Sequence, residues 1–102
     1  MAHTLKYVRV SPDELRRKFR DPSVEGRINS GELRSELLWE GHPSPIKSGE
    51  PFCTRSQILS FYDYNNTRIA VCHQYKRPDG RIGASGQLDP KRIVIRGTVY
   101  YV

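Results

Sequence analysis

The chain has 102 residues and a net charge of +6, from 17 lysines and arginines against 11 aspartates and glutamates. This length predicts a single domain, and 36% hydrophobic with 27% charged residues is typical of a folded protein rather than a disordered one. No apolar run approaches the ~20 residues of a membrane span. The N-terminal segment lacks the continuous apolar stretch of a signal peptide. We therefore expect a cytoplasmic protein without a membrane partner.

The first residues predict a strand followed by a helix. Residues 5–10 (LKYVRV) alternate polar and apolar side chains, which is typical of a strand. In Ser11-Pro12-Asp13-Glu14, the serine is a helix cap, the proline suits the first helical position, and the glutamate completes a capping box. A helix is therefore expected over residues 12–20, with Leu15 and Phe19 on its buried face.

A second helix is expected to follow, from Ser30 to Gly41. Three leucines, Leu33, Leu37 and Leu38, would form its buried stripe, with Trp39 beside them. Glycine commonly ends a helix, and it stands at position 41. The connection over residues 41–51 is rich in proline and glycine and is expected to be irregular.

The second half of the chain predicts strands, at residues 57–64, 67–77 and 93–102. Asn65-Asn66 tolerates the positive φ of a tight hairpin turn and would join the first two. Residues 81–92 have weak strand character, and Gly97 suggests a bulge or a close approach within the last strand. Because the last strand is rich in β-branched residues and tyrosines, we expect it to be paired on both sides.

The fold class expected from this order is α+β. The single domain over residues 1–102 would have the order β-α-α-β-β-β, with a mainly antiparallel sheet and two helices packed on one face. This order, together with the basic charge, is similar to the layout of RelE-type ribonuclease toxins. The resemblance covers architecture and matches no catalytic motif residue by residue, so it assigns no functional position. It implies binding or cleavage of RNA as a hypothesis.

Most of the positive charge lies between residues 68 and 96. Seven lysines and arginines stand there against Asp79 and Asp89, which is +5 of the net +6. Such a surface favours a nucleic acid, RNA above all, or an acidic protein as partner. The other interpretation is a solubilising surface that has no partner. The candidate anion-binding and nucleic-acid-binding residues are Arg68, Lys76, Arg77, Arg81, Lys91, Arg92, Arg96 and Tyr100.

The sequence identifies no catalytic residue, but the strand over 67–77 carries three candidates. Its alternation puts His73, Tyr75 and Arg77 on one face. A histidine exchanges protons near neutral pH and an arginine stabilises negative charge, which would suit metal-free cleavage of RNA. The alternative is a half-buried structural histidine at the end of a strand. Because the histidines are scattered and no cysteine stands at a ligand spacing from them, no metal site or cofactor is expected.

Three glycines, Gly80, Gly83 and Gly86, are spaced three residues apart beside the basic residues. They match neither the dinucleotide fingerprint nor the P-loop. Such a loop either points backbone N–H groups at a phosphate or simply permits positive φ angles. The two cysteines, Cys53 and Cys72, are expected to be reduced and buried.

Whether the protein is an enzyme stays open at this point. The alternative to nucleic-acid binding is a protein-interaction or homodimerising module without enzymatic activity. It would pair through an exposed strand edge near residues 81–92.

Overall fold

The computed structural model describes residues 5–20, 24–43, 49–83 and 86–102. Strand β1 (Lys6–Arg9) is followed by the helices α1 (Pro12–Arg20) and α2 (Val24–Asn29). The remaining strands are β2 (Arg34–Pro43), β3 (Arg55–Tyr62), β4 (Arg68–Lys76), β5 (Asp89–Ile95) and β6 (Thr98–Tyr101). Residues 44–48 of the expected irregular connection lie outside the described residues. Neither described helix is long and apolar enough to cross a membrane.

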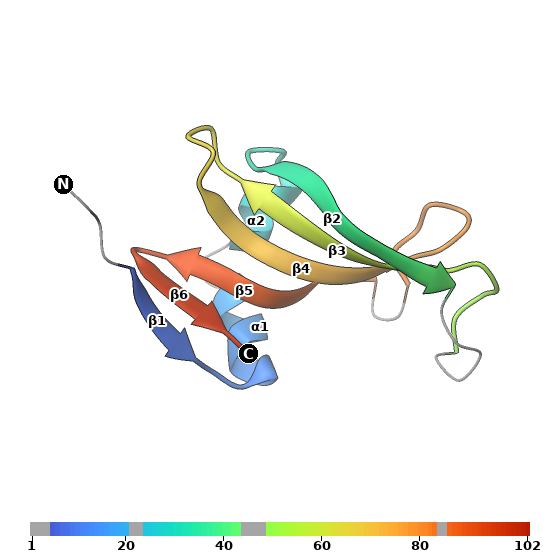
Figure 1. Cartoon of the computed structure of the whole chain (residues 1–102), viewed down its shortest axis with the longest axis horizontal. Coiled ribbons are helices and arrows are strands. Elements are labelled where there is room, and N and C mark those ends of the chain that lie inside the picture. The colour runs from blue at the N-terminus through green and yellow to red at the C-terminus, as the bar shows by residue number, and fades with distance from the viewer. Residues whose placement is uncertain (1–4, 21–23, 44–48, 84–85) are drawn as a thin grey trace.

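The six strands form one sheet in the order β1-β6-β5-β4-β3-β2. All neighbouring strands are antiparallel except β1 and β6, which are parallel. Both helices lie on the same side of this sheet, which is the far side in Figure 1. The α+β class and the two helices on one face of a mainly antiparallel sheet are therefore confirmed.

The core lies between the helices and the sheet face that they cover. Leu15 and Phe19 are fully buried, and because they stand four residues apart they share one side of α1. They form one cluster with Ala70 and Cys72 of β4 and with Ile93 of β5. The predicted cap is present as well, since the backbone N–H of residue 14 donates to the Ser11 hydroxyl at 3.1 Å.

The second helix expected at residues 30–41 is wrong. A short helix stands earlier, at α2, and the leucine-rich segment is strand β2. Leu33 is buried in the core as expected, but Leu37 and Trp39 pair with Leu59 and Ile58 of β3 and are 53% and 54% exposed. Pairing with β3 outweighs the helical preference that the leucine spacing indicates, because tertiary contacts override local propensity.

The single strand expected at 93–102 is also wrong, because two strands occupy this region. Arg96 and Gly97, with φ angles of 48° and 77°, form a two-residue turn between β5 and β6. Strand β5 already begins at Asp89, so residues 89–92 belong to a strand that pairs with β4, with one register shift between Pro90 and Arg92. Both β5 and β6 have neighbours on each side, which confirms the expected double pairing.

The hairpin at Asn65-Asn66 is confirmed, since β3 pairs with β4 around it and Asn66 has a φ of 62°. The exposed edge expected near residues 81–92 is not found at β5, which is interior. The two edge strands of the sheet are β1 and β2.

Candidate functional site

The sheet face opposite the helices carries no helix in the described part of the chain, and we call it the open face (Figure 1). Side chains of residues paired across strands point to the same face of a sheet. Arg92 precedes the buried Ile93 and therefore points to the open face. Val71 and Tyr101 pair with Arg92, and Arg9 pairs with Tyr101, so these residues share that face.

One part of the open face combines tyrosine rings with arginine side chains. The guanidinium of Arg92 lies 5.7 Å from the centre of the Tyr7 ring, which is 58% exposed. Arg9 and Tyr101 lie beside them on β1 and β6. Neither arginine has an acidic partner among the described residues. We call Tyr7, Arg9, Arg92 and Tyr101 the tyrosine–arginine cluster.

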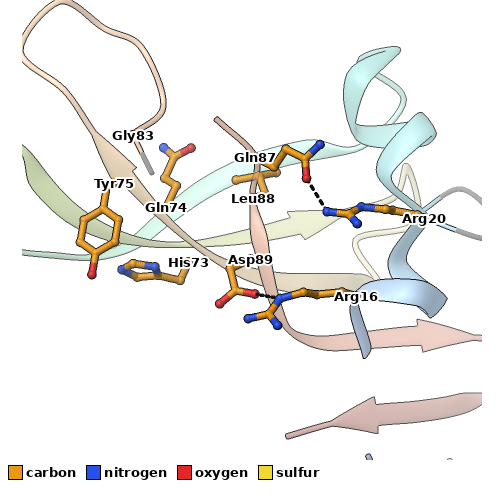
Figure 2. A pocket seen from close by; sticks show the side chains of 9 residues that line it. All are labelled: Arg16, Arg20, His73, Gln74, Tyr75, Gly83, Gln87, Leu88 and Asp89. Atoms are coloured by element: carbon orange, nitrogen blue, oxygen red, sulfur yellow. Dashed lines mark hydrogen bonds and ion pairs between the residues drawn. The ribbon is translucent and has the colours of Figure 1, made fainter. Parts of the chain in front are cut away.

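A pocket of about 360 Å³ opens beside β4, where β5 begins (Figure 2). It exists because the edge of β4 is only partly paired here. His73 pairs with Asp89 at one side of the gap, and the Gly83 N–H donates to the Tyr75 carbonyl at 2.6 Å on the other. We call it the His73 pocket; its lining residues are Arg16, Arg20, His73, Gln74, Tyr75, Gly83, Gln87, Leu88 and Asp89.

His73 is held by neighbours on two strands. Its Nε2 lies 2.7 Å from the Ser56 hydroxyl of β3, and its ring meets the Tyr75 ring edge-on with centroids 4.7 Å apart. Partial burial lowers the pKa of His73, and the charge of Lys91 lowers it further, while Asp89 acts in the opposite direction. The imidazole is therefore neutral at pH 7, with one nitrogen that donates and one that accepts a hydrogen bond.

Helix α1 contributes two arginines to the pocket. Arg16 Nε donates to Asp89 Oδ1 at 3.0 Å, and Lys91 Nζ binds Asp89 Oδ2 at 2.9 Å. Partial burial acts to raise the pKa of Asp89, but the hydrogen bonds from Lys91 and Arg16 outweigh it, so the pKa is lowered. Asp89 is therefore ionised at neutral pH. Arg20 donates to Gln87 across the pocket.

Ser56, His73 and Asp89 lie on three neighbouring strands but do not form a catalytic triad. Both Asp89 oxygens bind cations, and no hydrogen bond joins Asp89 to His73. A serine nucleophile needs that imidazole–carboxylate bond to orient its base. Among the described residues, no three histidine, cysteine, aspartate or glutamate side chains are placed to hold a metal ion; His3 lies outside those residues.

The basic residues expected to bind an anion are spread along the sheet. Arg68 and Lys76 stand at opposite ends of β4, about 26 Å apart at the usual rise of a strand. Arg96 lies in the β5–β6 turn, near the Arg68 end. Arg81 stands beyond the other end, in an ion pair with Asp79. The set therefore does not form one continuous surface.

Three further members of that set are engaged in contacts or face the helices. Arg77 forms an ion pair with the largely buried Glu50 at 3.0 Å. Lys91 binds Asp89, and Tyr100 lies on the helix-covered face, where Lys18 stands 4.5 Å from its ring centre. Arg92 is the member that lies in the middle of the open face.

Of the three catalytic candidates, His73 and Tyr75 lie together and Arg77 does not join them in the pocket. Arg16, Arg20 and Ser56 are the neighbours of His73 that the sequence analysis did not single out. The polar face of α1 was visible in the sequence. Which of its arginines reach β4 depends on how the helix crosses the sheet, and no local pattern encodes that crossing.

The remaining sequence features have structural explanations. A Cβ atom at Gly83 would lie 1.6 Å from Glu50 Oε1, so the close approach of this carboxylate requires glycine there. Cys72 is free and buried as expected, and burial raises its pKa to about 12. Cys53 is free as expected but exposed, which corrects the prediction that both thiols are buried.

No protein-family model, no curated protein and no solved structure matches this chain. The likeness to the layout of RelE-type toxins therefore has no further support, and the open face and the His73 pocket are the features that bear on function.

Proposed function

We propose that this protein binds single-stranded RNA across the open face of its sheet. The observation that supports this most is the tyrosine–arginine cluster, where the exposed Tyr7 ring lies beside two guanidinium groups that have no acidic partner among the described residues, on the face that carries no described helix. Bases stack on aromatic rings and guanidinium planes, and arginines neutralise the phosphates between them. The net charge of +6 brings RNA to this surface by long-range attraction.

The His73 pocket extends the proposed surface. Val71 pairs with Arg92 and stands two residues before His73 on β4. Tyr101 and His73 are therefore about 12 Å apart, from the usual spacing and rise of strands. A short single strand can contact both. The neutral His73 with Ser56 supplies a donor and an acceptor for a ribose 2′-hydroxyl, which favours RNA over DNA.

The test is fluorescence anisotropy with a labelled single-stranded oligoribonucleotide over a salt series. We expect Arg92→Ala to weaken binding and to reduce the slope of log K against log salt by about one, because one phosphate contact is lost. Tyr7→Ala should weaken binding by about 1–3 kcal/mol without changing the slope, because stacking involves no counterion release.

The matched control is Arg17→Ala, which removes the same charge from the exposed side of α1. It should leave affinity nearly unchanged. If wild-type protein does not bind RNA at low salt, or if Arg17→Ala weakens binding as much as Arg92→Ala, the proposal is wrong. Equal affinity for polyglutamate and for RNA would favour an acidic protein as the partner.

Cleavage of the bound RNA is a second candidate, favoured by the position of Arg16 in the pocket of the neutral His73. His73 would take the proton of a 2′-hydroxyl, whose oxygen attacks the phosphorus while the 5′-oxygen leaves and takes a proton from water. A guanidinium stabilises the charge that develops. We expect products with a 2′,3′-cyclic phosphate in the presence of a chelator, and none with His73→Ala. Intact RNA after incubation with excess wild-type protein would leave binding alone.

A further inference from the structure

A second pocket, of about 210 Å³, lies on the open face where β4 begins. Its floor is apolar, because Val71 shares the open face with Arg92 and Val94 stands two residues after Arg92 on β5. Leu5, just before β1, adds a third apolar side chain. The side chains of Arg68 and Arg92 complete the lining that matters here. We call it the Arg68 pocket.

The polar part of the Arg68 pocket carries mainly hydrogen-bond donors. An arginine offers five N–H donors and no acceptor. Neither Arg68 nor Arg92 has an acidic partner among the described residues, and Arg68 is exposed. The Thr67 hydroxyl, which also lines the pocket, can donate or accept. The pocket is therefore complementary to a group that combines an apolar surface with adjacent hydrogen-bond acceptors.

We propose that the Arg68 pocket holds one guanine base of the bound strand and that Arg68 reads this base. The inference rests on the proposed RNA binding. On its Hoogsteen edge guanine presents two adjacent acceptors, O6 and N7, which match the fork of an arginine. On the same edge adenine presents an amino donor beside N7, cytosine an amino donor, and uracil a single acceptor. The apolar face of the purine ring would cover Val71 and Val94.

The Arg68 pocket is continuous with the tyrosine–arginine cluster. Arg92 lines the pocket and also contacts the Tyr7 ring. On the other side of the pocket, Tyr62 of β3 pairs with Arg68, and its ring centre lies 5.0 Å from the Arg34 guanidinium. An RNA strand that stacks on Tyr7 can therefore place a neighbouring base in the pocket. In this arrangement Arg92 contacts the ring and a phosphate of the strand, and Arg68 contacts the edge of the base.

Fluorescence anisotropy with uridine strands that carry one central guanine, adenine or cytosine tests the base preference. We expect wild-type protein to bind the guanine strand at least about fivefold more tightly than the other two and than the all-uridine strand, which is the lower end of what one bidentate contact provides. Replacing the guanine by 7-deazaguanine, which lacks the N7 acceptor, should remove most of this preference.

Arg68→Lys tests which side chain reads the base, because it keeps the positive charge and removes the fork. This variant should bind the all-uridine strand as wild-type protein does, but without a preference for guanine. It should also bind the guanine and 7-deazaguanine strands equally, since both changes remove the same contact. The matched control, Arg17→Lys, makes the same exchange at an exposed position of α1 and should retain the preference.

Val94→Phe tests the pocket itself. The larger ring would occupy the space above the floor without changing the charge, so this variant should also lose the preference for guanine while it still binds the all-uridine strand. Circular dichroism verifies that each variant is folded.

Three results would overturn the inference alone. The first is binding of the all-uridine strand with no gain from guanine, which would leave the proposed RNA binding intact. The second is a preference for guanine that Arg68→Lys or Val94→Phe retains in full. The third is a preference that 7-deazaguanine does not reduce, which would mean that another edge of the base is read. If no strand binds at low salt, the inference and the proposed function are both wrong.

Discussion

His73 acquires its chemistry from residues that are distant in the sequence. Ser56 comes from β3 and Lys91 from β5, and neither is within ten positions of the histidine. Burial among these neighbours disfavours the charged imidazolium, so the folded protein holds the ring neutral under conditions where a free histidine is partly protonated. The state of this one residue decides whether the pocket presents a hydrogen-bonding group or a third cation.

The lowered pKa of His73 predicts a loss of stability in acid. The folded state binds a proton there less readily than the unfolded chain, whose pKa is near 6.5. The resulting stability is present above that pKa and is lost as the pH falls through the lower folded value. We expect the melting temperature of wild-type protein to drop more between about pH 7 and pH 5 than that of His73→Gln. An imidazole titration midpoint above 6.5, measured by NMR, would contradict this.

At the scale of the elements, the structure differs from the local sequence pattern in two places, strand β2 and the β5–β6 hairpin. In β2 the leucines have helical spacing, but pairing with β3 outweighs it. In the hairpin, the chain reverses at Arg96-Gly97, where the glycine had indicated only a bulge or a close approach within one strand. Arg96 has a positive φ, a conformation that favours glycine or asparagine. Its backbone is therefore strained, and an arginine at this position does not predict a turn.

The turn predicts stability changes of opposite sign at neighbouring positions. Gly97→Ala should lower the free energy of unfolding by about 1–2 kcal/mol, because alanine is strained at a φ of 77°. Arg96→Asn should raise it by a few tenths of a kcal/mol. A Cβ at Gly97 would meet no atom within 4 Å, so the first change reports backbone conformation alone. Urea denaturation measures both, and a Gly97→Ala protein as stable as wild type would contradict the assigned turn.

For the whole molecule, the important property is that both described helices cover the same side of the sheet. The molecule measures 49 × 28 × 21 Å, with the helices on one side of the sheet only. The tyrosine–arginine cluster on β1, β5 and β6 is therefore reached from the side of the sheet that carries no described helix.

Features set by contacts over a few residues were readable from the sequence. Ser11 and Glu14 predict the start of α1 because the capping hydrogen bond forms within the first turn of the helix. Asn66 predicts the β3–β4 turn because asparagine tolerates the positive φ that the turn requires. Leu15 and Phe19 are core residues for a similar reason, since their spacing alone puts them on one side of a helix. The same local patterns established the α+β class and the basic character of the chain.

The tertiary structure alone decided where the remaining residues act. Strand β2 exists because β3 offers it a partner, and that pairing left Leu37 and Leu38 of the predicted core stripe 53% and 49% exposed at the edge of the sheet. The His73 pocket depends on Arg16 reaching Asp89, a contact between residues 73 positions apart. Such contacts depend on how the helices and strands cross and pair, and the spacing of residues along the sequence does not predict that geometry. The sequence by itself thus determined the class and the charge, and the packing of the elements determined the candidate surfaces.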